Sequence, residues 1–161
     1  MISDVQPLVT VEAFNLVSSA VLGEAGIWHT IRDPKDLSTA EGRAQKFHFD
    51  WSDAKQLTFI LGHHLIFLGL GAIAFVEWAK RHGIYDSALG AVRRVEPNID
   101  LGMVWGYQAN FLSISSLEDV MGGHAVLAFI LTIGGVWHII TSPFGPFKKL
   151  LIYNGESILS Y

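Results

Sequence analysis

Two histidines, His124 and His138, are the residues in this sequence whose type and spacing best suit chemistry. They are 14 residues apart and are the only ionisable side chains between Val120 and Thr141. On an α-helix, 14 steps of about 100° place two imidazoles about 40° apart around the axis and about 21 Å apart along it. The spacing therefore puts two neutral metal ligands on one helix face, one in each half of the helix.

The segment that carries these histidines predicts a transmembrane helix. Its 22 residues from Val120 to Thr141 contain no Asp, Glu, Lys or Arg. At a rise of about 1.5 Å per residue they extend about 33 Å, enough to cross a bilayer core of about 30 Å. This arrangement suits flat, metal-centred pigments that stack along the helix, one near each membrane surface.

Two earlier segments also predict membrane spans, which gives an all-α, multi-pass fold with about three spans at 8–31, 57–78 and 119–141. The first is the weakest, since Glu12 and Glu24 interrupt it. A charge at the centre of an inserted helix costs about 3 kcal/mol, but less near the ends, where these two glutamates lie. The second carries no formal charge from Leu57 to Val76.

The residues between the spans read as polar connections. The second connection, 82–116, contains several glycines and a proline, and its Arg93 and Arg94 are close in sequence to Glu96 and Asp100. His48, in the first connection, reads as a surface histidine, and the last four residues, 158–161, read as the beginning of another helix. Seven basic residues near the spans on one side, against four on the other, favour the first connection and the C-terminus as the positive, cytoplasm-equivalent side.

Composition agrees with a membrane protein and excludes several other classes. Half of the 161 residues are hydrophobic and only 16% are charged, which is well below an ordinary soluble domain. The length fits one domain. A net charge of −4 argues against nucleic-acid binding, and the absence of cysteine excludes disulfides, thiolate metal sites and iron–sulfur clusters. The N-terminus lacks the basic region of a signal peptide.

Histidines in all three predicted helices indicate ligation of a pigment. They are His29, His63 or His64, His124 and His138. Polar groups within a membrane are costly and usually functional. The alternative, an interhelical hydrogen bond, is equally good for any single histidine. Glycines lie beside these positions (Gly62, Gly122, Gly123, Gly134), where they either leave room for a flat ring or allow close helix packing.

The set of histidines fits chlorophyll better than haem. A b-type haem between two helices needs a second histidine pair at matching spacing, but Asn15 lies 14 residues before His29 and Trp78 lies 14 after His64. Chlorophyll needs only one axial ligand on its magnesium, and magnesium also accepts an Asn carbonyl or a water. A b-type haem subunit for electron transfer and a pigment-poor structural photosystem subunit remain alternatives.

Several motifs in fixed order resemble the six-helix chlorophyll antenna family. They are GIWHTIRDP, QLTFILGHHLIFLGLGA, GIYDSALGAVR, SLEDVMGGH, GGVWHI and KKLLIYNGE, and the match covers nearly the whole chain from about Leu16. This family includes the inner-antenna chlorophyll protein of photosystem II, the iron-stress-induced chlorophyll-binding protein and the prochlorophyte chlorophyll-binding proteins. The GHH and KKLLIYNGE motifs look closer to the accessory antennae.

The resemblance implies a non-enzymatic light-harvesting protein that passes excitation energy to a photosystem. The chain corresponds to the family's second to fourth helices and the start of the fifth, either as a fragment or as a truncated form of one antenna domain. The implied axial ligands of chlorophyll magnesium are His29, His64, His124 and His138. His63 is a further candidate, as is Asn15, which stands where the family has a ligand histidine.

The resemblance also implies the surroundings of the chain. Carotenoids would fill grooves between the helices, and the pigment would be chlorophyll a or a variant. The partners would be core subunits of photosystem I or II, other antenna copies and thylakoid lipids, in a multi-pass thylakoid location. The connection after His29 would be stromal or cytoplasmic, and the one after Trp78 lumenal.

Overall fold

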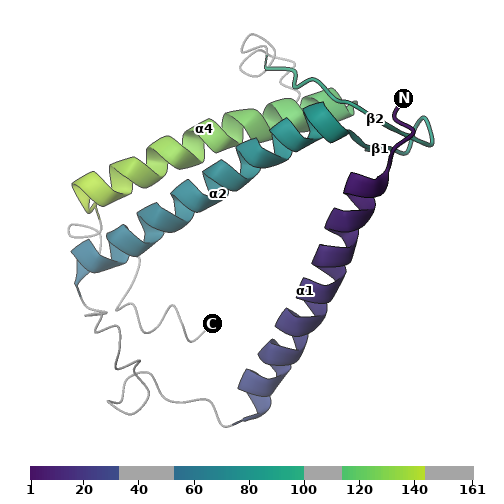
Figure 1. Cartoon of the computed structure of the whole chain (residues 1–161). Helices are drawn as coiled ribbons and strands as arrows, with labels where there is room; N and C mark the ends of the chain where they lie inside the picture. The colour runs from purple at the N-terminus through teal and green to yellow at the C-terminus, as the bar shows by residue number, and fades with distance from the viewer. Residues whose placement is uncertain (33–52, 100–113, 144–161) are drawn as a thin grey trace.

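The computed structural model describes residues 1–32, 53–99 and 114–143, and within them it contains three long helices and a short hairpin (Figure 1). The helices are α1 (Gln6–Ile31), α2 (Ala54–His82) and α4 (Leu117–Thr141). All three are long and apolar enough to cross a membrane, so the predicted all-α, multi-pass fold is confirmed. Their ends lie within four residues of the predicted spans. His48 and the predicted helix start at 158–161 lie outside the described residues.

Local sequence explains where the helices begin and end. Pro7 occupies the first turn of α1, where its missing N–H costs nothing. At the start of α2, the Asp53 carboxylate accepts a hydrogen bond from the backbone N–H of Lys55 at 2.9 Å. At the start of α4, the Ser116 hydroxyl accepts one from the N–H of Asp119 at 3.3 Å. Helix α2 stops at Gly83, whose φ of +79° favours glycine.

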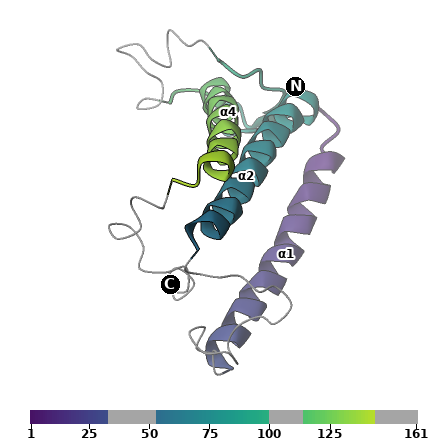
Figure 2. The ribbon, with the colours of Figure 1, turned by 90° about the vertical axis from the view of Figure 1, so that its left-hand side faces the viewer.

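Helices α2 and α4 pack against each other in antiparallel orientation (Figures 1 and 2). At one end of the pair, the Thr58 hydroxyl donates to Ser142 Oγ at 3.0 Å. At the other end, Val76 and Ala79 of α2 and Met121 of α4 form a small buried cluster. Val95, from the connection between the two helices, completes it. The two helices are therefore in contact along their whole length.

Glycines allow this close approach. A Cβ atom added to Gly62 would lie 2.5 Å from the carbonyl oxygen of Gly135, and one added to Gly135 would lie 2.5 Å from the carbonyl oxygen of Gly62. Farther along, a Cβ atom on Gly69 would lie 2.8 Å from the carbonyl oxygen of Ala128. Small residues at helix contacts are typical of membrane proteins, where backbone proximity replaces the hydrophobic driving force.

A two-stranded hairpin covers one end of the pair. Strands β1 (Ile84–Asp86) and β2 (Ala91–Arg93) are antiparallel and follow α2 directly. The chain then passes back over the pair, since the N–H of Asn98 donates to the carbonyl of Glu118 at 3.0 Å. The N-terminal segment joins the same structure, because the N–H of Ile2 donates to the carbonyl of Val92 at 2.9 Å. The hairpin was not predicted from the sequence.

Arg93 fastens the hairpin to α4. Its Nε lies 2.6 Å from Asp86 Oδ2, and its Nη2 donates to Glu118 Oε2 at 3.0 Å, with a second ion pair between Nη1 and the other Glu118 oxygen. The hydrogen bond from Arg93 lowers the pKa of Asp86 below its ordinary value of 3.8, against the opposing effect of desolvation. Sequence proximity had placed Arg93 near Glu96 and Asp100, but its acidic partners come from the strand and helix on either side.

Helix α1 stands apart from the pair. It begins beside the hairpin and diverges from α2 and α4 along its length (Figure 1), and Figure 2 shows it separated from α2. None of its residues is buried, although they are apolar on average. A helix that is apolar all round needs lipid, pigment or other protein around it.

Candidate pigment-binding site

The predicted ligand histidines lie at two levels along the helices. His138 is close to the end of α4, and His63 and His64 lie in the first half of α2. Because α2 and α4 are antiparallel, these three share the end away from the hairpin. His29 is near the end of α1 that points away from the hairpin. His124 lies near the hairpin end. The structure thus spreads the histidines over both ends of the bundle.

Three of the imidazoles are anchored to their own helices in one common way. Nδ1 lies 2.7 Å from the Phe59 carbonyl oxygen in His63, 2.9 Å from that of Ile60 in His64 and 2.8 Å from that of Val120 in His124. A carbonyl only accepts, so the Nδ1 of each neutral ring carries the proton and donates it. This hydrogen bond leaves the Nε2 lone pair for a metal and fixes the ring's orientation, as in well-formed histidine metal sites.

Aromatic rings hold the histidines in place. Trp28 meets His29 edge-on with ring centres 4.9 Å apart, and Trp137 meets His138 in the same way at 5.0 Å. His124 is held across the helix pair, because the ring of Phe75 from α2 lies 5.3 Å from it, also edge-on. Sequence reasoning missed Phe75, since its contact with His124 depends on the antiparallel alignment of α2 and α4.

Open glycines give two of the histidines a flat surface beside them. A helical side chain leans towards the preceding turn, so a ring bound to it covers residues three and four positions earlier. Gly134 lies four residues before His138, and Gly26 lies three before His29. A Cβ added at either glycine would meet nothing within 4 Å. Gly26 was missed from the sequence, although the spacing that drew attention to Gly134 could have found it.

The other glycines near histidines have different roles. Gly62 and Gly122, each expected to flatten the surface beside a ligand or to permit packing, prove to be packing residues. Gly62 contacts α4 closely, and a Cβ on Gly122 would collide with the backbone of Asn98. Gly123, next to His124, is open. Of the glycines named from the sequence, only Gly123 and Gly134 leave free space.

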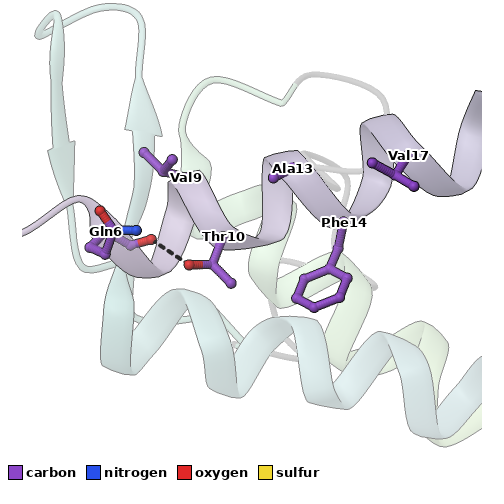
Figure 3. A pocket seen from close by; sticks show the side chains of 6 residues that line it. All are labelled: Gln6, Val9, Thr10, Ala13, Phe14 and Val17. Atoms are coloured by element: carbon purple, nitrogen blue, oxygen red, sulfur yellow. Dashed lines mark hydrogen bonds between the residues drawn. The ribbon is translucent and has the colours of Figure 1, made fainter.

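The further candidate Asn15 lies on the exposed surface of α1. Near it, one side of α1 forms an apolar groove of about 380 Å³, lined by Gln6, Val9, Thr10, Ala13, Phe14 and Val17. Figure 3 shows Thr10 and Phe14 on the same side of α1. The groove fits an extended hydrocarbon better than a polar substrate, because its lining is almost wholly apolar. Asn15 itself does not line it.

These histidines can supply single ligands to a metal that brings its other ligands with it. Among the described residues there is no group of three or more His, Asp or Glu side chains arranged to hold a bare ion. The nearest aromatic partner of His124 on α2 is a phenylalanine, so a haem with two facing histidines has no support there. A tetrapyrrole with one axial imidazole fits this geometry.

Comparison with known proteins identifies the family. The family described as photosystem II protein matches residues 3–161 of this chain. The chain belongs to this family. The resemblance to the chlorophyll antenna proteins, read from the GHH, SLEDVMGGH and GGVWHI motifs, is therefore confirmed.

Similar proteins carry light-harvesting names. The divinyl chlorophyll a/b light-harvesting protein PcbC of Prochlorococcus marinus strain SARG is 57% identical over 156 residues, which are 94% of this chain and 44% of that protein. PcbA of strain MIT 9313, of the same description, is 51% identical over 162 residues, which are 99% of this chain and 43% of that protein. The chain thus spans less than half the length of these relatives.

Proposed function

We propose that this chain is a light-harvesting antenna protein of the thylakoid membrane, in which histidines hold chlorophyll and excitation energy passes to a photosystem. The observation that carries the proposal is the anchoring of His64 and His124 through Nδ1, which leaves Nε2 for a metal, in helices long and apolar enough to cross a membrane. The names of the relatives support the same pigment class. No bond-making chemistry is proposed.

The proposed axial ligands are His29, His64, His124 and His138, with Asn15 as a weaker oxygen ligand. When bound, chlorophyll supplies the absorption of light and the excited state that is passed on. The protein would fix each chlorophyll through its imidazole. At His29 and His138 a neighbouring tryptophan holds the imidazole, and Gly26 or Gly134 would leave room for the chlorophyll beside it. Fixed positions matter because energy transfer depends on pigment spacing and orientation.

The surroundings are also proposed. The apolar groove on α1 suits the polyene of a carotenoid, since its lining offers almost no polar surface. The exposed apolar surface of α1 suits lipid, a photosystem I or II core subunit or another antenna copy. The histidines then lie at two levels, with His29, His64 and His138 near one membrane surface and His124 near the other. The first connection faces the cytoplasm or stroma, and the hairpin faces the lumen.

An absorption spectrum of the purified chain from pigmented membranes tests the function. We expect a red chlorophyll band that copurifies with the protein and transfers energy, seen as fluorescence excited through accessory pigments. Haem bands that change on reduction would contradict the proposal and favour an electron-transfer subunit. A colourless, folded protein would leave only a structural role.

A further inference from the structure

Two adjacent histidines on α2 lie outside its contact with the partner helix. Gly62 faces α4 directly, as its contact with Gly135 shows. Successive helical residues are turned by about 100°, so His63 lies to one side of the contact with α4 and His64 lies close to the face opposite it. Their exposure agrees with this placement, since His63 is partly exposed and His64 is exposed. Among the described residues, neither imidazole forms a hydrogen bond to another helix.

The imidazole of His63 is held in the same way as that of His64. Within the described part of the chain each ring makes one hydrogen bond, from Nδ1 to the carbonyl four residues earlier, at 2.7 Å for His63 and 2.9 Å for His64. His63 is held more firmly, because the ring of Phe59 lies against it with centres 4.1 Å apart. Phe67 lies edge-on to both imidazoles with ring centres 6.3 Å away.

The hydrogen bond to the helix uses only one of the two ring nitrogens of His63. Its Nδ1 is bonded to the Phe59 carbonyl, and within the described part of the chain its Nε2 makes no hydrogen bond. A polar nitrogen that faces hydrocarbon without a partner is unfavourable, and such groups in membranes usually bind something. His63 therefore meets the same conditions as the proposed ligand His64.

We propose that His63 is also an axial ligand, so that α2 carries two chlorophylls side by side, one on His63 and one on His64. This inference rests on the proposed antenna function. A side chain of α2 reaches about 5–6 Å from the helix axis, and a bond of about 2 Å to magnesium would place each metal about 8 Å out. Two metals turned by about 100° are then on the order of 12 Å apart.

Chlorophylls held by His63 and His64 would lie on different sides of α2, because the two imidazoles leave the helix about 100° apart. At this separation two chlorophylls interact as a pair, which alters their circular dichroism. The proposal thus predicts an optical signature as well as a pigment count.

Single and double variants of the full chain, purified with chlorophyll a, test the inference. We expect His63→Leu and His64→Leu each to lose about one chlorophyll, the double variant to lose about two, and each single variant to lose the paired circular dichroism signal. His82→Leu is the matched control on the same helix, because His82 stacks on Trp78 at the helix end, with ring centres 4.3 Å apart, and should lose none. An unchanged pigment count in His63→Leu would overturn the inference.

A second variant covers the case in which His63→Leu fails to assemble. His63→Gly removes the ligand and leaves space for added imidazole, which should restore one chlorophyll and the paired signal. No recovery with imidazole would overturn the inference, since a site that needs only an axial nitrogen should accept it. If the unaltered chain binds no chlorophyll at all, the proposed function itself fails, which separates the two outcomes.

Discussion

The α2–α4 pair and α1 are both long apolar helices, but they are stabilised in different ways. The pair is held by backbone contacts between glycines, by a hydrogen bond at one end and by a buried cluster with the Arg93 ion pairs at the other. Helix α1 has no buried residue and is tied to the rest through Ile2. The comparison shows that the chain specifies the shape of the pair by itself, whereas the position of α1 depends on what surrounds it.

The same contrast appears at the scale of single residues. Gly134 and Gly135 are neighbours on α4, yet Gly135 touches α2 and Gly134 faces open space one turn before His138. Gly135 therefore allows the two helices to pack closely, whereas Gly134 leaves room for a pigment on the helix surface. Substitutions at these residues separate folding from pigment binding.

The largest effect is expected from Gly135→Leu. A Cβ there would lie 2.5 Å from the Gly62 carbonyl oxygen and 2.7 Å from Ile66 Cγ1, so the helices must separate. Overpacking of this kind costs about 1–3 kcal/mol or more. We expect a clear fall in the thermal midpoint and yield of folded protein, measured by circular dichroism in detergent.

Gly23→Leu on α1 is the matched control, because a Cβ at Gly23 meets nothing within 4 Å. It should leave the stability within about 0.5 kcal/mol of the original, as for an exposed site. Equal destabilisation by both variants would contradict this difference and show that α1 is packed as tightly as the pair.

A smaller loss is expected from Arg93→Ala. The side chains of Arg93 and Asp86 are 21% and 13% exposed, and removal of the arginine leaves two carboxylates without their shared cation. We expect the hairpin to detach from α4, seen as faster amide hydrogen exchange at Val92 and Asn98. Arg81→Ala is the control, since that side chain is 75% exposed and pairs with Glu77 at 3.7 Å, and it should have little effect. Equal exchange in both variants would contradict the role of Arg93.

The most local effect is expected from Gly134→Leu. The new side chain has room, so the helix pair and its thermal midpoint should stay unchanged. It would, however, cover the surface on which a ring bound to His138 must lie. We expect the loss or a spectral shift of one chlorophyll, measured by pigment extraction and absorption. Retention of all pigment with an unaltered spectrum would show that Gly134 does not shape the site.

The sequence predicted the three helices well, because uncharged runs of about 20 residues have few other structures open to them. It did not predict the hairpin, since three-residue strands around Gly90 carry too little pattern to distinguish from a loop. It also could not separate Gly134 from Gly135, or assign Arg93 to Glu118 rather than Glu96. Each of these depends on the antiparallel alignment of α2 and α4, which only the folded chain reveals.

The histidines were found from the sequence because ionisable groups are rare in such segments. Their anchoring was not, because the hydrogen bonds to Phe59, Ile60 and Val120 depend on side-chain orientation. His63 and His64 share this anchoring, and for that reason both are proposed as ligands. The family motif alone favours His64.

Pigment counts of two substitutions on α4 test the central claim most directly. In each of the variants His124→Leu and His138→Leu, the purified chain should hold about one chlorophyll fewer per protein. Circular dichroism should show that the helix pair is still folded. Loss of a different spectral component in each variant would reflect the two levels along α4. An unchanged chlorophyll ratio in both folded variants would contradict the account that these histidines hold the pigments.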